Sequence, residues 1–382
     1  MAIDPIDTPC EPEDEDILHP AERSPADGAM AGAHPPPPPA YVTLELPAAV
    51  PCPAGCIHCS HRAATGPDGG GRRLTINDAM AIARNAARLG ATHFVAYPRS
   101  GDISLEPDRY APLFSLARSL RLRTKSTSAG VDPDGLIRLV PHLSQLTLSV
   151  DGLDPETFSR FRPAWLLERV ERFLDAFAAL PKRPALAANM VLTRSFMASG
   201  AFARTLDEVV ARGLFFKLNV LEILPGWDAD FAAERLGPDE IAELRRIKAE
   251  YRDRIKITIP SWQRGTPWAP SCPLGRSFLV IGPGGEVSPC VMLLHGGLTV
   301  THLNDEVSLE TAWQHIRESA RFRKARMKLF TAPAGFPHTS DLAACRKCSL
   351  FVQERCYGGC VARARLFGHE QEIARQCGGP LP

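Results

Sequence analysis

Several features that would place a chain in a common class are missing from this sequence of 382 residues. It has no run of about 18 or more apolar residues, so we expect no membrane-spanning helix. Its acidic N-terminus lacks the basic and apolar regions of a secretory signal, which predicts a cytoplasmic protein. Its 44 basic and 43 acidic residues nearly cancel, so charge gives no reason to expect a nucleic acid or a membrane surface as a partner.

Cysteine is absent from the 212 residues between Cys59 and Cys272, although the chain contains 11 cysteines. Cys10 stands alone near the N-terminus, and we assign it no role. The other ten form two groups, one on each side of the cysteine-free stretch. A disulfide framework is not expected in the reducing cytoplasm, whereas thiols clustered at short spacings indicate metal binding.

The composition changes at about residue 40. Residues 1–39 are acidic and then rich in Pro, Ala and Gly, which predicts a disordered tail because so little apolar surface can be buried. Its PPPPP run is either a polyproline II ligand for a partner or part of a solvated leader. Beyond the tail we predict a strand–helix domain over 40–235, a connecting helix and linker over 236–270, and a cysteine-rich domain over 271–382.

Strand and helix patterns alternate through the strand–helix domain. The predicted helices are TINDAMAIARNAARLG, with a Thr N-cap and a Gly stop, then DRYAPLFSLARSLR, PDGLIRLVPHL, WLLERVERFLDAFAAL and FARTLDEVVARG. The predicted strands are YVTLEL, THFVAY, LRTKSTS, QLTLSVDG, ALAANMVLT and FFKLNVLEIL. Six strand–helix units predict an α/β fold with a parallel sheet and outer helices, either a partial barrel or a doubly wound sheet.

The segment CPAGCIHC places Cys52, Cys56 and Cys59 on the loop after the first predicted strand. A closed zinc site needs four ligands, and a ferredoxin-type cluster needs four thiolates. Two alternatives therefore remain. One is a cubane 4Fe–4S cluster whose fourth iron is open to a molecule with adjacent amino and carboxylate groups. The other is a zinc site with a fourth ligand such as His58 or His61.

This spacing resembles the C-x3-C-x2-C signature of the radical SAM superfamily, which implies a partial (β/α)6 TIM-like barrel. The resemblance implies that the open iron binds S-adenosylmethionine (SAM). One electron from the cluster then yields a 5′-deoxyadenosyl radical, which abstracts hydrogen from the substrate. His58 falls on a position that is usually aromatic in the family, and it is an expected cofactor contact.

The segment SGDISLEPD after the second predicted strand resembles the family's G-G-E-P motif, which holds the SAM amino group. The four motif positions fall on Ser100, Gly101, Asp102 and Ile103. Asp102 keeps the carboxylate, whereas Ser100 and Ile103 depart from the pattern. The resemblance implies SAM contacts by the first three of these residues, at the strand end where barrel sites form.

Two more matches follow the fourth predicted strand. SVDG resembles the family's S-x-D-G, which implies that Ser149 and Asp151 lie near SAM. Arg160 and Arg162 follow where family members often place an arginine on the SAM carboxylate. The sequence does not distinguish the two, and each is alternatively a solvated helix arginine.

The second cysteine group begins with a predicted β-hairpin, which Cys272 and Cys290 bracket. The other five cysteines of the group are Cys345, Cys348, Cys356, Cys360 and Cys377. CRKC followed by CYGGC is alternatively a treble-clef zinc site, but seven cysteines are too few for two closed zinc sites.

This second group resembles the SPASM extension of radical SAM enzymes, except that seven residues rather than five separate Cys348 from Cys356. The resemblance implies a C-terminal extension of hairpin, loops and helix with two auxiliary 4Fe–4S clusters. The implied ligands are Cys272, Cys290 and Cys360 for the first, which lacks a fourth cysteine, and Cys345, Cys348, Cys356 and Cys377 for the second.

The resemblance as a whole implies a radical SAM/SPASM enzyme with three 4Fe–4S clusters, one for SAM and two that take an electron from a substrate radical. The leading expectation is oxidative modification of a ribosomally made peptide: a cross-link, a dehydrogenation or a thioether. The alternatives are a dehydrogenase or isomerase acting on a sugar, aminocyclitol or other small metabolite, and a non-catalytic zinc-binding scaffold.

Two kinds of protein partner are expected. One is an electron donor such as flavodoxin or ferredoxin. The other is a separate leader-peptide-binding protein, since residues 1–39 are too few and too rich in proline and charge to build the leader-binding domain of many peptide-modifying relatives. No residue stands out as a general acid or base. Glu222 and Asp228 lie where substrate should enter, and each is alternatively an ordinary loop carboxylate.

Overall fold

A computed structural model describes residues 38–59, 61, 73–212, 215–220, 234, 236–251, 255–258, 277–295, 299–304 and 306–318. The chain divides into two compact units, Met1–Pro36 and Pro37–Pro382. All described residues belong to the second unit. These residues with expected roles lie outside the described set: Cys272, Cys345, Cys348, Cys356, Cys360, Cys377, Glu222 and Asp228. Within the described set, no helix is both long and apolar enough to cross a membrane.

A ten-stranded sheet runs through the described residues in the order β10-β9-β8-β1-β2-β3-β4-β5-β6-β7. The six predicted strands are confirmed: β1 (Tyr41–Pro47), β2 (His93–Arg99), β3 (Arg123–Ser128), β4 (Gln145–Ser149), β5 (Ala185–Leu192) and β6 (Phe215–Val220). Each pairs in parallel with the next, and β7 (Ile255–Thr258) continues this order beside β6. The predicted α/β class with a parallel sheet is therefore confirmed.

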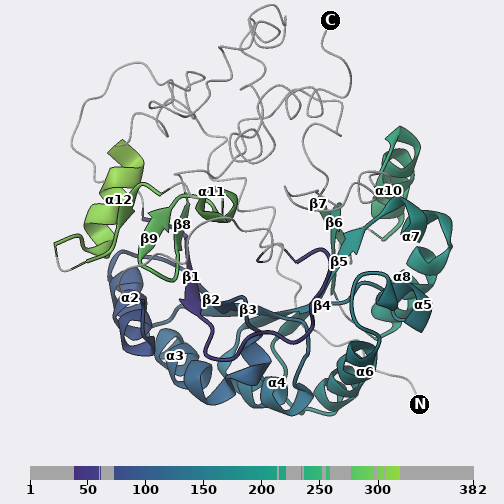
Figure 1. Ribbon diagram of the computed structural model, residues 1–382, viewed down its shortest axis with the longest axis horizontal. Helices are drawn as coiled ribbons and strands as arrows, with labels where there is room; N and C mark the ends of the chain where they lie inside the picture. The colour runs from purple at the N-terminus through teal and green to yellow at the C-terminus, as the bar shows by residue number, and fades with distance from the viewer. Residues whose placement is uncertain are drawn as a thin grey trace, which may run out of the picture. The chain divides into compact units, whose positions relative to one another are not determined.

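Helices follow the strands, and Figure 1 shows those after β1 to β4 side by side along one face of a curved sheet. The longer helices match the predicted ones: α2 (Ile76–Arg88), α3 (Pro107–Ser119), α4 (Pro133–Leu139), α6 (Trp165–Ala178), α8 (Ala201–Ala211) and α10 (Pro238–Tyr251). Thr75 caps α2 in a capping box with Asp78, and Gly90 follows its end with a positive φ of 85°. The Thr start and Gly stop read from the sequence are thus confirmed.

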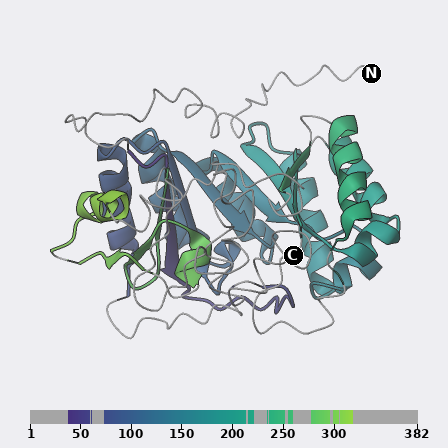
Figure 2. The same ribbon diagram turned by 90° about the horizontal axis from the view of Figure 1, so that it is seen from above.

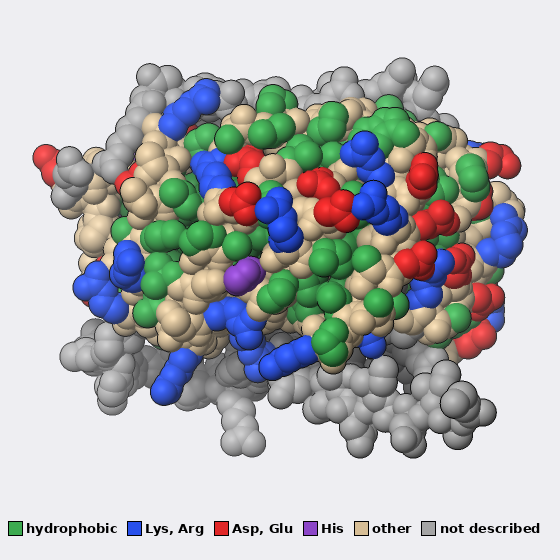
Figure 3. Space-filling model, turned by 90° about the horizontal axis from the view of Figure 1, so that it is seen from below, with side chains coloured by type: hydrophobic (Ala, Val, Ile, Leu, Met, Phe, Trp, Pro, Cys, Tyr) green, Lys and Arg blue, Asp and Glu red, His purple; other side chains and the backbone are tan. Residues whose placement is uncertain are grey.

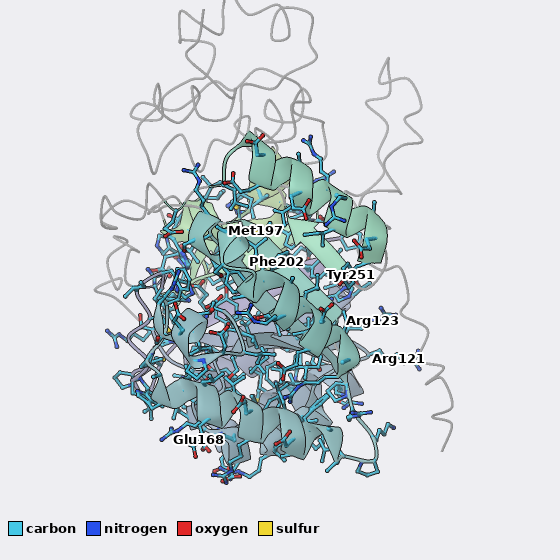
Figure 4. All side chains as sticks on the ribbon, turned by 90° about the vertical axis from the view of Figure 1, so that its right-hand side faces the viewer. Arg121, Arg123, Glu168, Met197, Phe202 and Tyr251 are labelled. Carbon is cyan, nitrogen blue, oxygen red and sulfur yellow. The ribbon has the colours of Figure 1, made fainter. Side chains whose placement is uncertain are left out.

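The sequence patterns did not indicate three short helical elements between β2 and β6. These are η1 (Ile103–Leu105), α5 (Pro155–Ser159) and α7 (Arg194–Ala198). Figure 4 shows α7 and α8 from the side, with Met197 and Phe202 labelled. The Phe196 and Phe202 rings pack with centroids 5.9 Å apart, and the Tyr251 hydroxyl donates to Asp207 at 2.8 Å, which ties α10 to α8.

Charges of both signs are interspersed on the outer surface over α3, α4 and α6 (Figure 3). Arg138 pairs with Asp108 at 3.0 Å, and Arg172 pairs with Asp134 at 2.5 Å. All four side chains are more than half exposed, so each pair contributes at most about 1 kcal/mol to stability. These exposed ion pairs therefore contribute little to the stability of the fold.

The alternation of side chains along the strands gives the sheet two different faces. In β1, Val42, Leu44 and Leu46 are fully buried in the core shared with the helices. The residues between them belong to the opposite face, and Glu45 there is opposite Tyr97 of β2 in register. That opposite face therefore carries the polar groups from which a site can be built.

The predicted hairpin is formed by β8 (Phe278–Ile281) and β9 (Glu286–Ser288), and β8 joins the sheet in parallel beside β1. Stacked rings fix this junction, because the Tyr41 ring lies 4.2 Å from His93 and 4.8 Å from Phe278, centroid to centroid. The sequence did not indicate this position, nor α11 (Val291–His295), β10 (Thr301–His302) or α12 (Leu309–Glu318), which lies beside α2 (Figure 2). The predicted domain boundaries beyond residue 40 stay predictions.

The cysteine-bearing loop after β1 is anchored to the end of β2. Pro51 forms an antiparallel bridge with Gly101, and the Cys52 N–H donates to the Ser100 carbonyl at 3.0 Å. Gly101 allows this close approach because it has no Cβ. The loop therefore begins in a position that the second strand sets.

Glu106 provides a second anchor for the same loop. Its Oε1 accepts the backbone N–H of Ala49 at 2.9 Å and of Val50 at 3.3 Å. Arg109 donates to Glu106 Oε2 at 2.6 Å and to the Pro47 carbonyl at 2.8 Å. Hydrogen bonds to a charged acceptor contribute about 1.5–3 kcal/mol each, so this carboxylate fixes the start of the loop strongly.

Gly101→Ala should displace the cysteine loop. A Cβ there would lie 2.7 Å from the Ala48 Cβ and 2.9 Å from the Pro98 Cβ, and overpacking of this kind costs about 1–3 kcal/mol. We expect less iron per chain than in the wild type after anaerobic reconstitution, measured by metal analysis. Gly284→Ala is the matched control, since its Cβ meets only the flexible carboxylate of Glu286. Equal iron in Gly101→Ala and wild type would contradict the assigned role of Gly101.

Candidate cofactor-binding site

Three free thiols lie on the loop after β1, where Cys52, Cys56 and Cys59 are all half-buried. The Cys59 N–H donates to the Cys56 carbonyl at 3.2 Å, so these two share one tight turn. Gly55 directly precedes that turn and has a φ of 58°, a conformation that favours glycine.

Two of the thiols, those of Cys52 and Cys56, keep their protons at neutral pH in the metal-free protein. Burial raises the pKa of the Cys52 thiol to about 11, and Asp102 and the other two cysteines act in the same direction. Burial also raises the pKa of Cys56, although the nearby Arg162 charge opposes this. Since metal binds thiolates, loading this loop must release protons.

The three thiols do not form a compact ligand group in the metal-free structure. Among the described residues, no group of three Cys, His, Asp or Glu that includes these cysteines has its ligand atoms within 4.8 Å of one another. Tetrahedral zinc with Zn–S bonds of about 2.3 Å would hold sulfur atoms about 3.8 Å apart. In a polynuclear cluster each thiolate binds a different metal atom, so the sulfur atoms need not lie that close together.

A buried ion pair links the end of β4 to the cysteine loop. Arg162 Nε donates to Asp151 Oδ2 at 2.5 Å, and these side chains are only 6% and 1% exposed. The same guanidinium presents Nη1 to the Cys56 Sγ at 3.4 Å and Nη2 to the His58 Nε2 at 3.2 Å. Arg162 thus places a fixed positive charge beside one of the three thiols.

Neighbouring groups keep this pair ionised. Burial alone would raise the pKa of Asp151, but Arg162 and His58 outweigh burial and hold it well below its usual range. The backbone N–H of Val191 helps by donating to Oδ1 at 2.8 Å. Burial alone would lower the pKa of Arg162, and Asp151 more than offsets it, so that pKa is raised. Both side chains are charged at neutral pH.

His58 lies between the ion pair and the cysteines. Its Nε2 is 3.2 Å from Asp151 Oδ2, and its ring meets Phe161 edge to face with centroids 5.6 Å apart. Its Nδ1 is buried and has no hydrogen-bond partner among the described residues. Buried polar atoms in proteins normally have a hydrogen-bond partner. A cofactor bound beside the three thiols would supply one to this nitrogen.

The Asp102 carboxylate accepts hydrogen bonds from neighbouring residues through both of its oxygens. Its two carboxylate oxygens accept from the Ser104 N–H at 3.0 Å, the Ser104 hydroxyl at 2.6 Å, the Ser128 hydroxyl at 2.7 Å and the Ala129 N–H at 2.6 Å. This side chain therefore joins the ends of β2 and β3. The SAM contact expected for it stays a prediction.

The other expected cofactor contacts occupy different environments. Ser100 is exposed, with a φ of 59° that is unusual for a residue other than glycine, and Ser149 ends β4 half-buried. Arg160 is 41% exposed and pairs with Glu156 at 3.0 Å, so it matches the solvated alternative. Arg162 is the arginine that reaches the cysteine loop.

Sequence reasoning did not single out Glu106 or Glu45. A charged residue in an otherwise apolar strand was the available signal for Glu45, because a buried carboxylate needs partners. Glu106 carried no such signal, since its backbone partners lie more than 50 residues earlier in the chain.

Asp151→Asn should leave the Arg162 charge buried without its partner, which costs about 3–5 kcal/mol. We expect the free energy of unfolding at pH 7 to fall by that amount in urea denaturation. Asp134→Asn removes an exposed partner of Arg172 and should cost at most about 1 kcal/mol.

The difference in the free energy of unfolding between the wild type and Asp151→Asn should also depend on pH. The pKa of Asp151 is lowered on folding from an unfolded value of about 3.9. Its stabilisation is therefore complete above about pH 5 and is lost as the pH falls through the lower folded pKa. A variant as stable as the wild type at pH 7, or a gap that grows in acid, would contradict the ion-pair account.

No family model matches the chain, and no curated protein matches it by sequence. Solved structures do match its fold. SuiB of Streptococcus suis bound to S-adenosylmethionine has a TM-score of 0.63 at 15% identity, covering 85% of this chain and 74% of that chain. SuiB bound to its precursor peptide SuiA has a TM-score of 0.61 at 13% identity, covering 88% and 76%.

A third match is anSMEcpe with bound AdoMet, with a TM-score of 0.57 at 14% identity, covering 90% of this chain and 92% of that chain. At these identities the likeness concerns the fold. SuiB and anSMEcpe are radical SAM enzymes, so the resemblance read from the cysteine loop is confirmed at the level of architecture. The chain therefore shares its fold with these radical SAM enzymes.

Proposed function

We propose that this protein is a radical SAM enzyme in which Cys52, Cys56 and Cys59 hold a 4Fe–4S cluster with one iron open to SAM. The observation that carries the proposal is a loop of three half-buried free thiols after β1, tied to the end of β2 and to Arg162. The fold likeness to two SAM-bound proteins supports it. When bound, the cluster and SAM supply the 5′-deoxyadenosyl radical that abstracts hydrogen from substrate.

The chain's own residues prepare this site. The Arg162 charge beside Cys56 favours the thiolate form that binds iron, and Asp151 fixes the direction of that guanidinium. Glu106 and Gly101 hold the start of the loop in place, so the thiols need little reorganisation. Partial burial of the loop limits water near the reactive centre.

For the rest of the molecule, we propose a partial (β/α)6 barrel followed by a SPASM extension with two auxiliary 4Fe–4S clusters. The cysteine pattern from Cys272 to Cys377 supports this. Cys290 is the one ligand of that group within the described residues, at the end of the hairpin that joins β1. A flavodoxin or ferredoxin would supply electrons in the cytoplasm.

The proposed substrate is a ribosomally made peptide that undergoes oxidation to a cross-link, a dehydrogenated residue or a thioether. Support comes from the fold shared with SuiB in its complex with the precursor peptide SuiA. A peptide encoded by a short reading frame beside this gene should stimulate SAM cleavage and lose mass as hydrogen. Stimulation by a sugar or aminocyclitol instead would assign the enzyme to small metabolites.

Replacing Cys52, Cys56 and Cys59 together with Ala should abolish 5′-deoxyadenosine formation from SAM under dithionite. The two auxiliary clusters should remain, so about eight of twelve irons should survive at four per cubane. Cys10→Ala, outside both cysteine groups, is the control and should keep full iron and full cleavage. Undiminished SAM cleavage in the triple variant would overturn the cluster assignment.

A further inference from the structure

A second cluster of ligand-type side chains includes none of the three thiols. Glu45 of β1, His61 just beyond the cysteine loop and His295 at the end of α11 each bring one ligand atom to within 4.8 Å of the others. Glu45 and His295 are 250 residues apart in the chain. Among the described residues, no other group of three has this compactness.

Glu45 is fully buried, yet only one of its oxygens has a hydrogen-bond partner among the described residues. Oε1 accepts the Tyr97 hydroxyl at 3.1 Å and lies 2.8 Å from His295 Nε2. Oε2 has no hydrogen-bond partner among the described residues, and Arg99 Nη1 lies 3.8 Å from it, beyond hydrogen-bond distance. An orphaned carboxylate oxygen in a buried place is costly unless something binds it.

His61 completes the group from a third direction. Its ring centroid lies 5.3 Å from that of His295 and 6.2 Å from that of Tyr97. Among the described residues, the Ser100 N–H donates to its Nδ1 at a long 3.4 Å. This weak bond leaves the ring free to engage a stronger partner.

The donor set and its spacing fit one divalent ion. Ligand atoms about 2.1 Å from a metal lie about 3.0 Å apart at right angles and about 3.4 Å apart in a tetrahedron. The Glu45 and His295 atoms already have nearly this separation at 2.8 Å. Two imidazoles and one carboxylate are the ligands of mononuclear Zn²⁺ and non-haem Fe²⁺ sites, and the Tyr97 hydroxyl is suited to orient the carboxylate.

We propose that Glu45, His61 and His295 bind a mononuclear divalent transition-metal ion, separate from any iron–sulfur cluster. The ion would join β1, the segment after the cysteine loop and α11. With three protein ligands, it would keep coordination positions open. This site does not depend on the proposed function, because neither SAM nor turnover enters the argument.

Zinc provides the test. Iron-reconstituted full-length protein should be incubated anaerobically with one to two equivalents of Zn²⁺ and desalted, and zinc and iron should then be counted per chain. We expect about one zinc in the wild type, with X-ray absorption at the zinc edge showing only nitrogen and oxygen ligands. Zinc should also raise the melting temperature, since it binds the folded state.

Glu45→Gln and His295→Gln should each lose the bound zinc and the zinc-dependent rise in melting temperature while keeping wild-type iron. His302→Gln, at an exposed histidine of β10 outside the cluster, should retain both. If one variant fails to fold, the other decides the question.

Three results would overturn the site. One is zinc that persists in both variants. Another is a zinc edge with sulfur ligands, which would place the ion on cysteines. The third is a loss of iron in His295→Gln, which would make His295 a cluster ligand instead.

Discussion

The buried contact between Asp151 and Arg162 is the interaction on which the candidate cofactor site depends. It takes an arginine from after α5 and holds its guanidinium against a thiol more than 100 residues away in the chain. A charged arginine without a partner would destabilise the fold at 6% exposure, because a paired carboxylate is needed to offset the desolvation cost. The pair therefore converts a sequence-distant residue into a fixed positive charge at the cysteine loop.

The remaining anchors act on the backbone of the loop rather than on its thiols. Gly101 lets the loop approach the end of β2, and Glu106 accepts the N–H groups that begin it. Together with Arg162, these contacts bring the ends of β1, β2 and β4 to one place. The carboxyl ends of parallel strands meet at one edge of a sheet, which is why this fold can gather a site from such separate segments.

The sequence predicted the local features of this architecture. β1 to β6 and the longer helices were readable because apolar periodicity, a Thr cap and a Gly stop are encoded within a few residues. The five-residue helices α5 and α7 were not, since so short a segment contains barely one period. The place of the hairpin beside β1 depends on stacking of Tyr41 with Phe278, which no local pattern contains.

The candidate site divides in the same way. The three cysteines were readable from their spacing, whereas Arg160 and Arg162 were indistinguishable because burial alone separates them. The contact between Glu45 and His295 could not be predicted from any local pattern, since 250 residues separate them in the chain. Local chemistry was therefore predictable, and the partners that tertiary packing supplies were not.

Electron–nuclear double resonance tests the central claim most directly, using reduced protein and SAM labelled with ¹⁵N in its amino group. If the loop cysteines hold a cluster with one open iron, the labelled nitrogen should couple to the cluster electron spin. The coupling should vanish when Cys52, Cys56 and Cys59 are all replaced with Ala. A wild-type protein that carries its full iron, binds SAM and shows no such coupling would contradict the account.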